Sequence, residues 1–198
     1  MTDLENYICG EIHDLPYDGG EHDFSEADRR KITIRNSRLY LKKVLRINYT
    51  TDDCRREQDS INVRTQSNIV TISYDADKST DNLYWYGKVI GIFWAEVYHQ
   101  FENVCYPSSD SVFIDIVWVR WYGRDSSVCS GWKARRLPRI GFDPGVPLGF
   151  IHPSQILRGA HLIPAFHHGQ TDHLFPPSKL ARRPEDNDKD WQFYYVNM

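Results

Sequence analysis

The pattern of apolar and polar positions along the chain predicts a protein built mainly from β-strands. Short apolar stretches rich in β-branched and aromatic residues alternate with polar segments that contain Gly, Pro, Asn or Asp. No internal repeat or heptad pattern is present. The clearest predicted strands cover residues 68–75, 83–99, 111–124, 157–167 and 191–198.

One face of the predicted strand at 83–99 contains two glycines. Strict alternation places Gly87 and Gly91 on the same face as Trp85, Val89 and Phe93. Glycines inside a strand permit the sharp coiling that closes a small barrel. We therefore predict a curled, SH3-like β-barrel with short helical turns.

The remaining segments contain weaker signals. Residues 31–47 alternate in short patches that favour strands, and 49–62 is predicted to be a polar, irregular connector. Ser154, after Pro153, predicts a single helical turn that stops before Gly159. Pro164 is expected at a sheet edge or bulge, because proline cannot donate to a strand ladder. Residues 176–190 are predicted to be a charged linker.

Composition limits the domain organisation and the setting. A chain of 198 residues, 26% charged and 40% hydrophobic, is expected to form one ordinary core. Its four cysteines are far apart and lack a C-x-x-C pair, which favours a reducing compartment over a disulfide framework. No apolar run approaches the roughly 20 residues that span a bilayer, and the first residues are acidic, so we expect neither a membrane protein nor an exported one.

Charge is distributed asymmetrically at the N-terminus. Residues 1–28 contain nine acidic and no basic side chains, whereas residues 29–46 contain eight basic and no acidic ones. We expect residues 1–44 to form a largely flexible arm, acidic and then basic, ahead of a β-domain at 45–198 with its core at 81–175 and a last strand at 191–198. The acidic part could fold back on the basic part, or the basic part could meet phosphates.

The order of several motifs resembles that of a bromo-adjacent homology (BAH) domain. The relevant motifs are YWYGKVIGIF, WVRWYGRD and IHPSQILRGAHLI, within residues 81–175. The family's acid and proline after the aromatic pair are replaced by Gly123, Arg124 and Asp125. The resemblance implies a β-barrel that binds chromatin.

Residues 48–198 also resemble the C-terminal region of proteins encoded by Plavaka-type transposons of basidiomycete fungi. Six ordered blocks support this resemblance, from NYTTDDCRREQDSIN to DWQFYYVNM. It implies a nuclear setting, a transposon origin and a transposase catalytic core that lies outside this chain. The expected function is a non-catalytic, chromatin-associated module that binds a histone tail or DNA, with a transposase core as a further possible partner and no cofactor.

Two kinds of binding site are predicted near the end of the strand at 111–124. A methyl-lysine cage needs several aromatic faces around a cation, often with a carboxylate. The candidates are Trp85, Trp118, Trp121, Tyr122, Asp125 and Trp132, with Asp115 as an alternative acid. Most of these rings could instead be core residues.

The same region could instead bind nucleic acid. Its basic residues would pair with phosphates while Trp132 stacks on a base. The candidates are Arg124, Lys133, Arg135, Arg136, Arg139 and Arg158. A solvated loop explains these residues equally well.

Catalysis and metal binding have less support in the sequence. His161, His167, His168 and His173 cluster, but their spacing matches no common zinc pattern. No nucleophile motif or phosphate loop is present. A divalent-metal-dependent nuclease or other hydrolase fragment, or a structural domain of a transposase, stays open as an alternative.

Overall fold

The computed structural model describes residues 2–15, 22–51, 53–73, 84–99, 111–130, 134–145, 148–179, 182 and 184–197, and the predicted mainly β class is confirmed. The helical elements are α1 (Thr2–Ile12), α2 (Glu26–Arg29), η1 (Arg35–Ser37), η3 (Pro153–Gln155), η4 (Phe166–His168) and η5 (Pro184–Asp186). The strands are β1 (Ile32–Ile34), β2 (Tyr40–Leu41), β3 (Leu45–Thr50), β4 (Arg56–Ile61), β5 (Asn68–Ile72), β6 (Tyr84–His99), β7 (Val112–Arg124), β8 (Arg139–Phe142), β9 (Leu148–Ile151), β10 (Ile156–Gly159), β11 (His161–Pro164), β12 (Gln170–Thr171), β13 (Asp190–Trp191) and β14 (Tyr194–Asn197).

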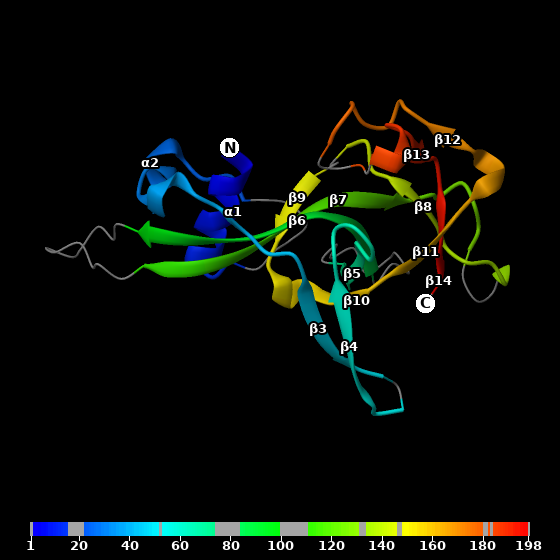
Figure 1. Ribbon diagram of the computed structural model, residues 1–198, viewed down its shortest axis with the longest axis horizontal. Helices are drawn as coiled ribbons and strands as arrows, with labels where there is room; N and C mark the ends of the chain where they lie inside the picture. The colour runs from blue at the N-terminus through cyan, green and yellow to red at the C-terminus, as the bar shows by residue number, and fades with distance from the viewer. Residues whose placement is uncertain are drawn as a thin grey trace, which may run out of the picture.

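The long antiparallel pair β6 and β7 forms the centre of the main sheet (Figure 1). The strand order is β10-β5-β6-β7-β8-β14-β11, with β1 and β2 on β6 and β9 on β7. The order ends at β10 and β11 without a pairing between them, so the sheet of described residues is not a closed barrel. Pro164 lies in the edge strand β11, as its missing N–H predicts.

A β-bulge in β6 corrects the predicted glycine face. Val89 pairs with Val119 and Gly91 pairs with Trp118, so β6 has one more residue than β7 between these two pairs. An extra residue reverses the alternation of side chains beyond it. Gly87 therefore faces Val119 and Trp121, whereas Gly91 faces Phe93 on the opposite side of the sheet.

The expectation that the N-terminal residues lack order is wrong for α1. Leu4, Tyr7 and Ile8 are buried against Val97 and Ile114 of the β6–β7 pair. Tyr7 Oη donates to the Asp115 carbonyl at 2.8 Å, and burial raises the pKa of this tyrosine. The helix is part of the core because its apolar residues follow the i, i+3, i+4 spacing of one face.

The acidic N-terminal part contacts the basic part that follows it. Arg29 Nη1 donates to Asn6 Oδ1 at 3.2 Å, and its Nε lies 3.9 Å from Glu5 Oε2. Lys31 pairs with Asp28 at 3.0 Å. These pairs neutralise charges at the start of the basic segment.

A buried ion cluster connects the C-terminal part to the sheet, where a charged linker was predicted. Arg120 of β7 is completely buried, and its guanidinium lies between the rings of Phe142 and Phe175, 3.4 and 4.6 Å from their centroids. Asp190 accepts from Arg120 Nη1 at 3.0 Å and from Arg182 Nη2 at 2.8 Å. The predicted linker is therefore wrong for Arg182 and Asp190, which are core residues.

The predicted irregular connector at 49–62 is also wrong. Residues 56–61 form β4, which pairs antiparallel with β3 in full register from Leu45↔Ile61 to Thr50↔Arg56. This hairpin projects from the body of the sheet (Figure 1). Hydrophobic patterning misses β4 because five of its six residues are polar.

Other expectations have mixed outcomes. A single 3-10 turn is present at η3, with His152 rather than Ser154 as its N-cap. Cys9, Cys54 and Cys129 are free thiols, and Cys105 lies outside the described residues. No helix in the described part of the chain is long and apolar enough to cross a membrane.

Candidate nucleic-acid interface

The predicted aromatic residues do not converge on one cage. Trp121 and Tyr122 are each only 7% exposed, and as neighbours in β7 they point to opposite faces of the sheet. Trp121 packs in the cluster with Val89 and Ile151, where Trp85 contacts its ring edge to face. These rings are core residues, so Trp121 and Tyr122 present no open faces to the predicted cage.

Trp118 and Asp125, two further cage candidates, each contact residues outside the candidate set. Trp118 stacks on Phe150 with ring centroids 6.3 Å apart. Asp125 accepts from Arg139 Nε at 2.6 Å and from Ser127 Oγ at 2.6 Å, and the Ser127 bond is the main cause that lowers the pKa of this carboxyl. Trp132 lies outside the described residues. Asp125 therefore stabilises the turn after β7 instead of facing a ligand.

The predicted basic residues occupy several environments. Arg139 is held by Asp125 and His168 and covers the Phe193 ring, so it is a structural residue. Arg124 Nη2 donates to Ser130 Oγ at 3.1 Å. Arg158 lies over the ring of Tyr49, with its Cζ 5.9 Å from the centroid.

Two of the predicted basic residues remain available for a partner. Arg135 and Arg136 are exposed. Neither side chain makes an ion pair or hydrogen bond within the described part of the chain. Lys133 lies outside the described residues. This loop therefore offers two exposed cations, but no regular surface that orders them.

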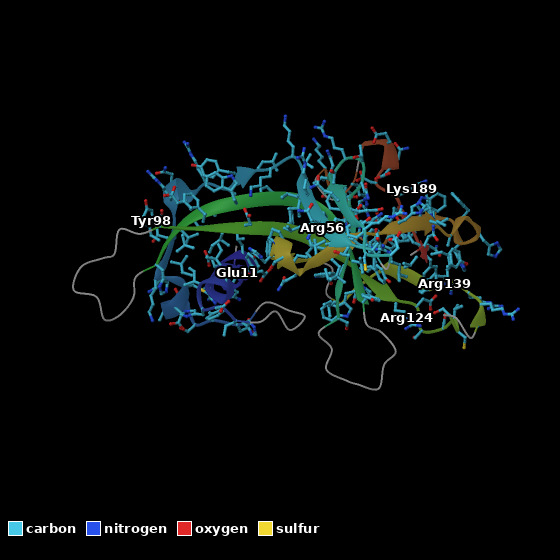
Figure 2. All side chains as sticks on the ribbon, turned by 90° about the horizontal axis from the view of Figure 1, so that it is seen from below. Glu11, Arg56, Tyr98, Arg124, Arg139 and Lys189 are labelled. Carbon is cyan, nitrogen blue, oxygen red and sulfur yellow. The ribbon has the colours of Figure 1, made fainter. Side chains whose placement is uncertain are left out.

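The hairpin β3–β4 offers a more regular basic surface, which sequence analysis missed. One face, here called the front face, consists of side chains that alternate along both strands and pair across them: Arg46, Asn48, Thr50, Arg56, Gln58 and Ser60. All six are exposed. None is a carboxylate, and Arg46 and Arg56 have no partner among the residues described. Figure 2, seen from the side toward which the hairpin projects, places Arg56 well apart from Arg124 and Arg139.

The opposite, rear face of the hairpin holds its acids and its anchors. Ile47 and Ile61 belong to the cluster with Ile69 and Ile156 in the body of the sheet. Asp59 Oδ2 accepts from the backbone N of Gly159 at 2.8 Å. Glu57, also on this face, accepts from Tyr49 Oη at 2.9 Å. Strand alternation thus separates the basic front face from the acidic and apolar rear face.

A row of aromatic rings forms a second exposed feature. Tyr40 stacks on Trp94 at 4.2 Å, and Phe113, which is 65% exposed, lies 5.5 Å from the same ring. A shallow cavity of about 310 Å³ is lined by Lys42, Trp94, Phe113 and Asp115. Lys42 Nζ already pairs with Asp115 at 2.5 Å, so this cavity contains its own cation and counterion.

The clustered histidines form no common site. Asn197 Nδ2 donates to His161 Nδ1 at 3.2 Å, His168 contacts Arg139, and His173 Nε2 lies 3.4 Å from Asp172 Oδ1. Within the described ranges, no three His, Cys, Asp or Glu side chains gather as metal ligands would.

Comparisons with known proteins give no relative to guide the assignment. Protein-family models, curated proteins and solved structures were compared with the chain, and none of them matches it. The functional argument therefore depends on the chain's own residues.

Proposed function

We propose that this protein is a non-catalytic module that binds DNA through the front face of the β3–β4 hairpin. The observation that carries the proposal is an exposed strand-pair face without a carboxylate, on which two arginines have no partner among the residues that the structure describes. Arginine side chains on such a face meet phosphates without repulsion from acids. A chromatin and nuclear setting, a transposon origin and a BAH-like relationship of the core belong to this proposal as what the sequence resemblances imply.

DNA is preferred over a histone tail because of where the aromatic residues lie. A methyl-lysine reader needs open ring faces, and Trp121 and Tyr122 are buried. A cationic histone tail would also be repelled by the exposed guanidiniums of Arg46 and Arg56.

Salt-dependent binding tests the proposal. The full chain is titrated with a fluorescent duplex of random sequence, and anisotropy is measured over a range of salt concentrations. Because each phosphate contact contributes about 0.9 to the slope of log affinity against log salt, Arg46→Ala with Arg56→Ala should flatten the slope by nearly two units. Arg135→Ala with Arg136→Ala removes the same charge from another surface and serves as the matched control.

The outcomes separate the candidate surfaces. A flattened slope for the hairpin variant alone supports the proposal. A flattened slope for the loop variant alone would move the site to the segment before β8. Absence of DNA binding by the unaltered chain would refute the proposal, and a panel of methylated histone peptides and a nuclease assay with and without Mg²⁺ would then test the alternatives.

A further inference from the structure

The dimensions of the hairpin fit the major groove of B-form DNA. Six residues per strand extend over roughly 20 Å, and the two strands lie about 4.8 Å apart. The major groove is about 12 Å wide and admits a two-stranded ribbon. A ribbon that projects from the sheet, as this one does in Figure 1, can enter a groove while the rest of the molecule stays outside it.

The residue types on the front face are those that read base edges. Arginine donates two parallel bonds to guanine O6 and N7, and asparagine or glutamine pairs with adenine N6 and N7. Arg46 and Arg56 lie toward opposite ends of this face, and the cross-strand pair Asn48↔Gln58 lies between them.

The central amide pair is already ordered for such a contact. Gln58 Nε2 donates to Asn48 Oδ1 at 2.7 Å. This bond leaves the amide nitrogen of Asn48 free to donate and Oε1 of Gln58 free to accept. One free donor beside one free acceptor matches the N7 acceptor and N6 donor of adenine.

The rear face holds the ribbon in one register. A shift of one residue would exchange the two faces and turn Glu57 and Asp59 toward the DNA. Burial of Ile47 and Ile61, together with the Asp59 bond to Gly159, opposes that shift. The front face is therefore presented as a fixed pattern of donors and acceptors.

We propose, on the basis of the proposed function, that the β3–β4 ribbon lies in the major groove of duplex DNA, where Asn48 and Gln58 read an adenine and the flanking arginines contact guanine or phosphate. The protein then selects a short sequence, since roughly 20 Å of ribbon covers about six base pairs.

Selection from a randomised duplex pool with the full chain tests this inference. A short enriched motif that contains adenine is expected. Asn48→Ala with Gln58→Ala should lower the preference for that motif over a scrambled duplex about five- to hundredfold, while affinity for the scrambled duplex and the salt slope stay unchanged. Gln170→Ala, which removes an exposed amide on β12, is the matched control and should leave the preference intact.

Base analogues identify the groove. Replacing adenine by 7-deazaadenine within the motif removes the N7 acceptor from the major groove and should weaken binding to the motif, because the amide nitrogen of Asn48 loses its acceptor. Inosine in place of guanine alters the minor groove and should have little effect.

The results distinguish this inference from the proposed function. DNA binding without an enriched motif, or a motif whose preference survives the double amide change, would overturn groove reading and leave DNA binding intact. Loss of binding to every duplex tested with the unaltered chain would overturn both.

Discussion

Replacing Asp190 by Asn should destabilise the fold more than replacing its buried partner Arg120 by Met. Arg120 and Arg182 are 0% and 4% exposed and share this carboxylate, which is itself 4% exposed. Arg182 Nη1 also lies 3.7 Å from Oδ1 of the more exposed Asp188. Asn keeps the shape of the side chain but removes the carboxylate charge that pairs with Arg120, for which no second carboxylate partner is found among the described residues. Removal of one partner from a buried ion pair costs about 3–5 kcal/mol, because the remaining charge is left uncompensated.

The loss of unfolding free energy for Asp190→Asn should fall near the upper part of that range, because the carboxylate accepts several hydrogen bonds from the two arginines. Asp190 Oδ2 accepts from Arg120 Nη1 and also from Arg182 Nε and Nη2, at 3.0, 3.2 and 2.8 Å. Among the described residues, Nε and Nη2 of Arg120 have no hydrogen-bond partner, so the contacts seen for this cation are one bond and two aromatic rings. Burial already lowers the pKa of Arg120, which indicates how poorly the site solvates a cation.

Urea unfolding followed by tryptophan fluorescence measures the effect. With an m-value of about 2 kcal/mol per molar, a loss of about 4 kcal/mol moves the midpoint down by about 2 M. Arg120→Met is the comparison, because it removes the unsatisfied donors, fills the space between Phe142 and Phe175, and leaves Arg182 paired with Asp190. It should cost at least about 2 kcal/mol less than Asp190→Asn. Equal losses for the two variants would show that charge imbalance is not what the cluster contributes.

Two further stability predictions concern the sheet and the helix on it. At Gly87 a Cβ would lie 2.2 Å from Cγ1 of the fully buried Val119, so Gly87→Ala should cost about 1–3 kcal/mol of unfolding free energy. Gly91→Ala should cost less, because its new methyl group meets the partly buried Phe93 ring, which can turn. Equal unfolding midpoints for the two variants would contradict this prediction. Ile8→Ala should lower the free energy of unfolding by about 2–4 kcal/mol because Ile8 is 0% exposed, and a loss below about 1 kcal/mol in the same urea assay would mean that α1 does not pack on the sheet.

The strands found from the sequence share one physical property. Residues 83–99 and 111–124 predict β6 and β7 almost residue for residue, because long runs of β-branched and aromatic side chains are buried on both faces. The bulge between Val89 and Gly91 has no counterpart in the hydrophobic pattern of the sequence. It depends on how two strands pair, and strict alternation therefore assigned Gly91 to the wrong face.

The missed elements depend on partners distant in the sequence. Helix α1 has a correct apolar spacing at Leu4, Tyr7 and Ile8, but its acidic composition suggested a tail. Burial of Asp190 becomes visible only when β7 brings Arg120 to it, across seventy residues. The aromatic candidates failed for a related reason: one strand contains both Trp121 and Tyr122, and composition does not reveal that both are enclosed.

The hairpin shows why a binding surface is harder to predict than a core. Hydrophobic patterning detects burial, whereas the front face of β4 is defined by Arg56, Gln58 and Ser60, none of which is buried. Only the register with β3 makes these side chains one surface with Arg46 and Asn48. Ile47, Ile61 and Asp59 on the rear face fix that register. The basic character of the exposed front face therefore depends on residues that lie on the opposite face of the hairpin.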